Sequence, residues 1–205
     1  ELMSGLTSHR HLHVTPGVVL GLAKAVGLEN LRFLPPPPEE AHLHGGLHTR
    51  HRDAESIVHH YDVSNQFYRL VLGPSMTYSC ALFRSEDDTL EQAQTNKFDL
   101  VCTKLGLRSG QRLLDVGCGW GGLLIHAATH YGVTGVGVTL SFEQEELARK
   151  RVAEAGLEDR IEIRRQDYRD ITDGPFDAIS SIGMFEHVGR NRMEEYFRRL
   201  HDLLV

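Results

Sequence analysis

The chain has 205 residues, of which 40% are hydrophobic and 24% are charged, a composition typical of a globular protein with one domain and an extension. Its formal net charge of −6 argues against a general nucleic-acid binder, which would normally present a basic face. Three widely spaced cysteines predict no disulfide framework and favour a reducing cytoplasm, and no apolar run reaches the roughly 18 residues of a membrane span.

Residues 1–52 form the first predicted region, an N-terminal extension that ends in a linker rich in proline and histidine. Thr15 and Pro16 predict the start of a short helix, because a capping hydroxyl precedes a proline suited to a first helical turn. The prolines at 35–38 predict an extended segment. Nine histidines lie between His9 and His60, but no cysteine accompanies them and their spacing fits no common zinc pattern, so we expect no metal site.

Residues 53–110 form the second predicted region, a helical cap. Helical turns are expected at 54–60 and 65–72, the second ended by Gly73 and Pro74. The sequence DTLE at 88–91 has the pattern of a capping box and predicts a helix that ends at Gly106.

Residues 111–205 form the third region, in which strand and helix patterns alternate. We expect strands at 112–116, 133–138, 161–165 and 176–182, and helices at 121–131, 141–155 and 192–204. This alternation predicts an α/β fold with a parallel sheet and right-handed crossovers.

A glycine-rich turn lies between the first of these strands and the helix that follows it. Gly117, Gly119 and Gly122 give the G-x-G-x-x-G pattern, in which glycine lets the backbone turn tightly and approach a ligand at a helix N-terminus. Asp115 extends the pattern to D-x-G-x-G-x-G, which is typical of the first motif of class I methyltransferases. Its carboxylate could attract the ammonium group of S-adenosylmethionine.

Two further features favour S-adenosylmethionine over a nicotinamide cofactor. The next strand ends at Thr139 and Leu140 without the acidic residue that usually binds a nicotinamide ribose. Asp167 and Tyr168 follow the third strand, where methyltransferases commonly contact adenine. Gln144 either binds the ribose hydroxyls or completes a capping box with Ser141, in the pattern S-x-x-Q. The two roles are compatible.

Five motifs occur in an order that resembles the cyclopropane-fatty-acid synthases and the mycolic-acid methyltransferases. They are HYDVSN at 60–65, YSC at 78–80, LLDVGCGWGG at 113–122, VTLS at 138–141 and GMFEHVG at 183–189. The resemblance covers residues 53–205 and implies a class I S-adenosylmethionine-dependent methyltransferase fold, Rossmann-like, with a helical N-terminal cap. The preceding segment, with its proline run and LHT at 47–49, resembles the actinobacterial branch of unsaturated-fatty-acid methyltransferases.

The resemblance implies a reaction at the cis double bond of an unsaturated acyl chain, usually in a phospholipid. The alkene takes the methyl group, a carbocation results, and loss of a proton closes a cyclopropane ring or leaves a methylene branch that a partner reductase completes. Because an alkene is a weak nucleophile, aromatic faces could stabilise the developing charge. Tyr61, Phe67 and Tyr78 lie in the region concerned. Core packing in the helical cap is the alternative role for all three, and it is the favoured one for Phe67.

The resemblance also implies site residues. The family base is a bound bicarbonate, whose ligands correspond to Cys80 and Glu186; His187 is either a base or a structural histidine, and a covalent role for Cys80 is an alternative. The motifs and the strand ends together predict these cofactor-binding residues: Tyr78, Ser79, Asp115, Gly117, Gly119, Trp120, Gly121, Thr139, Leu140, Gln144, Asp167 and Tyr168.

The predicted partner is a phospholipid acyl chain, reached by peripheral contact with the inner membrane face from the cytoplasm. A reductase partner and a homodimer are compatible with it. A class I sheet has further strands beyond the four predicted here, so we expect an incomplete sheet and a truncated chain without turnover of its own. The alternatives are a small-molecule O- or N-methyltransferase and a non-catalytic cofactor-binding module.

Overall fold

The computed structural model describes residues 16–17, 21, 24–25, 49, 53 and 64–205. The chain divides into two units, residues 1–40 and 41–205. In the first unit the described residues are helical and fall within the predicted short helix. The proline run, the nine histidines from His9 to His60 and the predicted turns at 54–60 lie outside the described residues.

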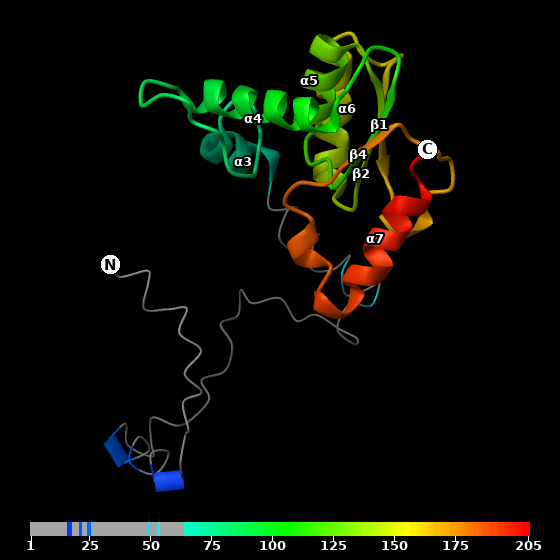
Figure 1. Cartoon of the computed structure of the whole chain (residues 1–205). Helices are drawn as coiled ribbons and strands as arrows, with labels where there is room; N and C mark the ends of the chain where they lie inside the picture. Colours follow the sequence, from blue (N-terminus) through cyan, green and yellow to red (C-terminus); the bar gives the residue numbers. More distant parts are fainter. Residues whose placement is uncertain (1–15, 18–20, 22–23, 26–48, 50–52, 54–63) are drawn as a thin grey trace. The chain divides into compact units, whose positions relative to one another are not determined.

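The second unit is built on a parallel sheet of four strands in the order β3-β2-β1-β4 (Figure 1). The strands are β1 (Arg112–Val116), β2 (Thr134–Thr139), β3 (Ile161–Arg165) and β4 (Ala178–Ser180). The predicted parallel α/β architecture is therefore confirmed, with β1 and β3 at the predicted bounds. The fourth strand is shorter than the predicted 176–182, because Phe176 instead forms a bridge with Leu204.

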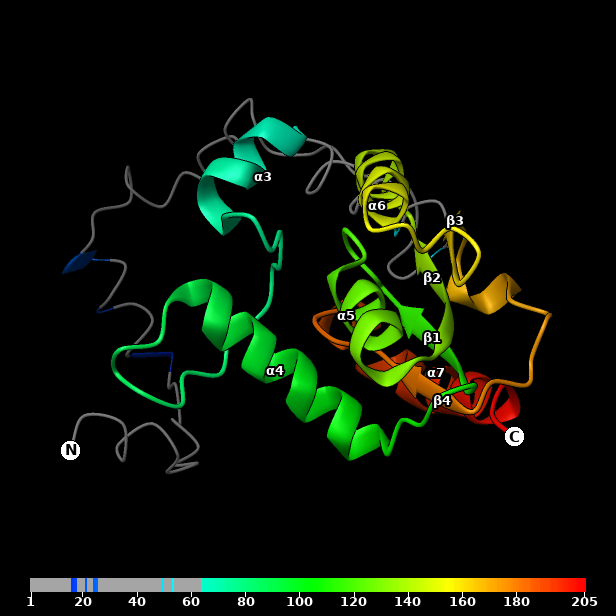
Figure 2. The ribbon, with the colours of Figure 1, turned by 90° about the horizontal axis from the view of Figure 1, so that it is seen from above.

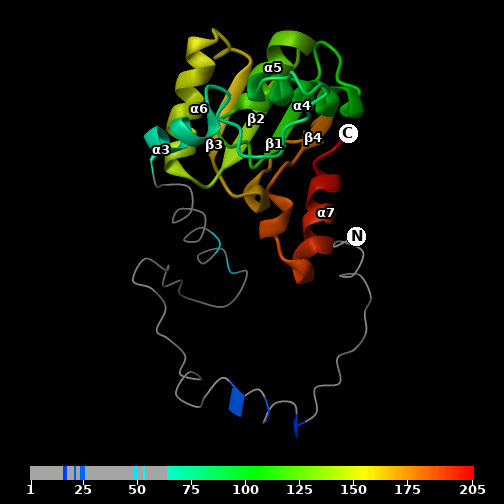
Figure 3. The ribbon, with the colours of Figure 1, turned by 90° about the vertical axis from the view of Figure 1, so that its left-hand side faces the viewer.

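Helices cover both faces of this sheet (Figures 2 and 3). On one face lie α4 (Leu90–Leu105), α5 (Gly122–Tyr131) and α6 (Phe142–Glu154), which share a core with Leu113. The adjacent Leu114 points to the opposite core, beneath α7 (Met193–Asp202), because side chains alternate along a strand.

Two glycines of β2 let α5 approach the sheet closely. A Cβ atom on Gly135 would lie 2.5 Å from Leu124 Cδ2, and one on Gly137 would lie 2.7 Å from Leu124 Cδ1. Real Cβ atoms do not come so near to other atoms, so a side chain at either position would push the helix away. The T-G-V-G-V-T sequence of β2 thus sets the depth at which the first turn of α5 sits.

The cap contains two described helices, α3 (Asn65–Leu72) and α4, and the predicted range of α3 is confirmed. The capping box of α4 is one residue later than predicted. Thr89 accepts a hydrogen bond from the Gln92 backbone N–H, and the Gln92 side chain accepts one from the Thr89 N–H. Asp88 cannot serve as the cap, because its carboxylate accepts the backbone N–H groups of Arg84 and Ser85.

The remaining helix ends lie within two residues of the predicted ones. Gly121 is the N-cap of α5 rather than its first residue, and Ser141 is the N-cap of α6. The last helix, predicted at 192–204, is α7 and runs from Met193 to Asp202. Among the described residues, none of the helices has the length and hydropathy needed to span a membrane.

Replacing Thr89 with alanine tests the observed capping box. We expect the free energy of unfolding to fall by about 1 kcal/mol, because the cap hydrogen bond is lost. Thr95→Ala is the control, since Thr95 is an exposed threonine of the same helix that bonds only to the Glu91 carbonyl. Urea unfolding measures both variants, and an equal change in the two would contradict a capping role for Thr89.

Candidate functional site

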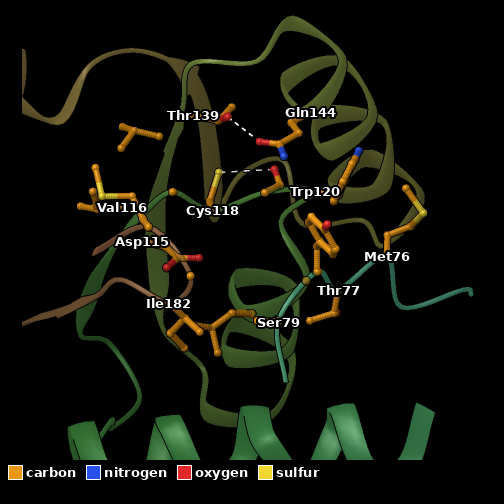
Figure 4. A pocket seen from close by; sticks show the side chains of 18 of the residues that line it. Met76, Thr77, Ser79, Asp115, Val116, Cys118, Trp120, Thr139, Gln144 and Ile182 are labelled. Carbon is orange, nitrogen blue, oxygen red and sulfur yellow. Dashed lines mark hydrogen bonds between the residues drawn. The ribbon is translucent and has the colours of Figure 1, made fainter. Parts of the chain in front are cut away.

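A pocket of about 970 Å³, counting its open mouth, lies at the carboxyl ends of β1 and β2 (Figure 4). Open parallel sheets characteristically bind their ligands at this edge. The glycine turn after β1 forms its floor, and further walls come from the loop at 76–79, from α4, from the start of α6 and from residues 182–184. The pocket therefore lies between the helical cap and the α/β region that follows it.

The glycine turn is held against the neighbouring strand by its own backbone. The N–H groups of Gly117 and Cys118 both donate to the Val138 carbonyl at 3.0 Å. Gly117 has a φ of +79°, and a Cβ there would lie 2.8 Å from Met184 Cβ, so glycine is required. An added Cβ on Gly119 would meet nothing within 4 Å, because that side of the turn faces the open pocket.

Asp115 supplies a buried carboxylate to this pocket from the end of β1. Its side chain accepts a hydrogen bond of 2.7 Å from Ser180 Oγ, and the residue is 4% exposed. Burial raises the pKa of Asp115 to about 6, although the Ser180 hydrogen bond and the charge of Lys97 oppose the increase. The site therefore holds an acid whose charged form gains from any cation that enters.

Lys97 is a pocket residue that the sequence analysis missed. It lies on α4, is 9% exposed, and its ammonium group donates to Ser79 Oγ at 2.8 Å. Burial lowers the pKa of Lys97 to about 8, against the opposing effects of Asp115 and then Cys80. One sequence signal could have indicated this lysine. It lies four residues after Ala93, on the same face of the helix, so a charged residue occupies the apolar face.

Gln144 takes part in the capping of α6, and its contact with the ribose hydroxyls stays a prediction. Its backbone N–H donates to Ser141 Oγ at 3.2 Å, which caps α6. Its Oε1 accepts a hydrogen bond of 2.7 Å from Thr139 Oγ1 (Figure 4). Thr139 Oγ1 in turn accepts the Ser141 N–H at 3.2 Å. Half of a capping box is formed, and the Gln144 amide nitrogen, which lines the pocket, is left to donate to a ligand.

Trp120 fixes the glycine turn to the helical cap. Its indole is 2% exposed and donates to Asn65 Oδ1 at 2.7 Å. The Asn65 amide in turn donates to the carbonyl of Glu143 at 3.0 Å and to its carboxylate at 2.7 Å. Arg151, from α6, donates to the Trp120 carbonyl at 2.8 Å and to the Ser75 carbonyl at 3.0 Å. The cap is thus bonded directly to the turn that forms the pocket floor.

Of the three aromatic residues predicted to stabilise charge, Tyr78 lines the pocket. Its ring centre is 5.8 Å from that of Tyr68, whose ring centre is 4.9 Å from that of Trp120. Phe67 is 49% exposed and lines neither of the two pockets found in the described residues, so packing within a core does not account for it either. Tyr61 lies outside the described residues.

The structure brings together the two segments that carry Cys80 and Glu186. A Cβ on Gly183 would lie 3.9 Å from both Ser79 Cβ and the Tyr78 carbonyl oxygen. The side chains of Cys80 and Glu186 are themselves exposed and line neither pocket in the described part of the chain. Their joint role therefore stays a prediction, as does that of His187, which lines both pockets.

Most of the predicted cofactor contacts share one pocket. The residues that line it are Tyr78, Ser79, Asp115, Gly117, Gly119, Trp120, Thr139, Leu140, Gln144 and Tyr168. Gly121 is absent from this lining, and Asp167 lines the smaller adjoining pocket, where its carboxylate pairs with Arg169 at 2.6 Å. Apolar loop residues such as Met76 and Ile182 also line the larger pocket. No local sequence pattern predicts that these residues lie in the pocket.

Comparison with known proteins agrees with this geometry. A family model described as mycolic acid cyclopropane synthetase matches residues 48–205. A probable fatty acid methyltransferase of Mycobacterium tuberculosis is 49% identical over 186 residues, which cover 88% of this chain and 43% of that protein. The cyclopropane-fatty-acyl-phospholipid synthase of Escherichia coli K12 is 48% identical over 138 residues, 67% of this chain and 35% of that one.

A solved structure is also similar. The crystal structure of the mycolic acid cyclopropane synthase CmaA1, complexed with SAH and CTAB, matches with a TM-score of 0.71 and 42% identity. That match covers 74% of this chain and 53% of the other. The chain thus spans between about a third and half of the length of these relatives. The class I methyltransferase fold is confirmed.

The buried carboxylate gives stability a pH dependence that can be measured. The pKa of Asp115 in the fold, about 6, exceeds the value of about 4 in an unfolded chain, so its contribution is full below pH 4 and is lost as the pH rises through 6. We expect Asp115→Asn to be more stable than the wild type at pH 7, by about 2–3 kcal/mol for a shift of this size.

Urea unfolding of both proteins between pH 4 and pH 7 measures this difference. Asp159→Asn, which changes an exposed aspartate, is the control and should follow the wild type. A difference between Asp115→Asn and the wild type that does not grow from pH 4 to pH 7 would contradict the raised pKa.

Proposed function

Because the chain belongs to the mycolic acid cyclopropane synthetase family, we propose that it forms the S-adenosylmethionine-binding part of a lipid-modifying enzyme. The reaction proposed is transfer of a one-carbon unit to the cis double bond of an unsaturated acyl chain, with a cyclopropane or a methyl-branched chain as product. One observation carries the proposal: the buried Asp115 carboxylate and the glycine turn share a pocket at the edge of the sheet where such ligands bind.

The pocket residues fit S-adenosylmethionine. Asp115 offers a buried carboxylate to the ammonium of its amino-acid end, the Gln144 amide can donate to the ribose hydroxyls, and Tyr168 offers a ring to the adenine. When bound, S-adenosylmethionine supplies a methyl group on a positively charged sulfur. The glycine turn allows close approach of backbone to ligand, because Gly119 adds no side chain to the floor.

The apolar part of the pocket suits an acyl chain. Met76, Ile182 and Met184 line it beside the polar residues and would exclude water from a reacting alkene. Tyr78, which lines the same pocket, would stabilise positive charge on the substrate through an interaction worth about 0.5–2 kcal/mol. Orientation of the weakly nucleophilic alkene would then come from the shape of this apolar wall.

The base of the proposed reaction is a bound bicarbonate, held near Cys80 and Glu186. The close approach of Gly183 to the backbone of Tyr78 supports this, because it puts the two segments side by side at the pocket mouth. His187 is the alternative base, since it lines the pocket itself. A carboxylate beside a bicarbonate would share its proton, and the two would titrate as one unit.

The acyl chain would be reached at a membrane surface, by peripheral contact from the cytoplasm. Exposed apolar side chains on α3 support this: Leu70 is 83% exposed and Val71 is 57% exposed. Such residues at one face of a short helix can enter the boundary between lipid headgroups and acyl chains. A reductase would act on a methylene product, and a homodimer is compatible with the proposal.

The substrate class is tested by mass spectrometry of acyl chains. The natural protein in which this sequence occurs is incubated with S-adenosylmethionine and vesicles of a mono-unsaturated phospholipid. We expect the acyl mass to increase by one CH₂ and the internal cis double bond of the chain to disappear, whether the product is a cyclopropane or an exocyclic methylene. Asp115→Asn should abolish both the product and the binding of S-adenosylmethionine in titration calorimetry, whereas Asp159→Asn should change neither. Wild-type binding by Asp115→Asn would refute the cofactor assignment.

The role of Glu186 is tested separately with Glu186→Gln. We expect turnover to fall by about 10²-fold or more, the usual contribution of a group in acid–base chemistry, with the affinity for S-adenosylmethionine unchanged. The matched control is Glu158→Gln, at an exposed glutamate remote from either pocket in the described residues. Unchanged turnover in Glu186→Gln would remove this residue from the base machinery.

A further inference from the structure

We propose that Lys97 binds the carboxylate group of the amino-acid end of S-adenosylmethionine, opposite Asp115, which takes the ammonium group. The inference rests on the proposed function, because it assigns a second charged contact to the same cofactor. Together the two residues would recognise both charges of a zwitterion.

The geometry places two opposite charges on different walls of one pocket. Asp115 enters from the end of β1 and Lys97 from the middle of α4, and both line the cavity. The ion pairs formed by the described residues do not include one between Asp115 and Lys97. Each charge therefore remains available to an opposite charge on a ligand between the two walls.

The surroundings of Lys97 are those of a buried cation that lacks an anion in contact. Its ammonium group donates to the neutral hydroxyl of Ser79 and lies 4.6 Å from the centre of the Phe98 ring. An ammonium group has three donors, and a buried charge is costly unless it is paired. Burial lowers the pKa of Lys97 to about 8, because the nearby Asp115 and then Cys80 offset the effect of burial only in part. A ligand carboxylate would supply the missing partner.

The ammonium group is also held in place for this role. Gln94, one turn before Lys97 on α4, is 3% exposed and its amide donates to the Ser79 carbonyl at 3.0 Å. Ser79 is thereby fixed to α4 through both its backbone and its hydroxyl. A lysine that is anchored by such contacts loses less conformational freedom when it binds a ligand. The other function open to Lys97, positioning Ser79 without touching the ligand, is separated by the experiment below.

The test compares two ligands that differ at the amino-acid end. S-adenosylhomocysteine carries the carboxylate and the ammonium, whereas 5′-methylthioadenosine carries neither but keeps the adenosine and the sulfur. Titration calorimetry measures both ligands on the natural protein in which this sequence occurs and on its Lys97→Met and Lys104→Met variants; Lys104 is an exposed lysine of the same helix. We expect Lys97→Met to weaken S-adenosylhomocysteine by roughly tenfold or more, as for loss of a charge-assisted hydrogen bond, and to leave 5′-methylthioadenosine unchanged.

Each other outcome is decisive. Equal weakening of both ligands by Lys97→Met would show that Lys97 maintains the shape of the pocket, and no weakening would show that it does not bind the carboxylate; either result overturns the inference. If the wild type binds neither ligand, the proposed cofactor is wrong, and the role proposed for Lys97 is refuted as well. Should Lys97→Met not fold by thermal melting, Lys97→Gln, which keeps a donor for Ser79 without the charge, is measured in the same way and must show the same selective loss.

Discussion

The burial of one carboxylate at the end of β1 is the constraint on which the site depends. Asp115 is held by Ser180 on the neighbouring strand, so its oxygen atoms are fixed by the sheet rather than by a loop. Burying a carboxylate is unfavourable to its charged form, and the pKa of Asp115 is raised for that reason. The glycine turn gives a ligand room to approach the Asp115 carboxylate, and Lys97 partly balances the charge of that carboxylate. The pocket is therefore organised for a zwitterion before one binds.

The strands and the glycine turn could be predicted because their signals are local. Strand β3 alternates buried and exposed residues, and Asp115 precedes a glycine pattern, so neither needed knowledge of distant contacts. The start of α4 was predicted one residue early because two overlapping capping patterns are chemically equivalent, and only the amides of the preceding loop decide between them. Lys97 was missed because its partner, Ser79, lies 18 residues away along the chain.

The contacts of the cap change how the family motifs are understood. Asn65 and Trp120 belong to two motifs far apart in the sequence, and the structure joins them by a hydrogen bond of 2.7 Å. Trp120 also lines the pocket, whereas Asn65 lines neither of the two pockets in the described residues. A motif residue can thus be required for attaching the cap to the glycine turn. Reading every motif position as a ligand contact would overstate the size of the binding site.

The glycine at 137 has a consequence for redesign of this protein. A methyl group added there would lie 2.7 Å from Leu124 Cδ1 and 2.9 Å from Cys118 Sγ, and Cys118 lines the pocket. Strand β2 therefore packs directly against a residue of the pocket floor, and no other residue lies between them that could adjust to a change in volume. Directed evolution toward other acceptors would find little tolerance in β2, and useful diversity would have to come from the loops at the pocket mouth.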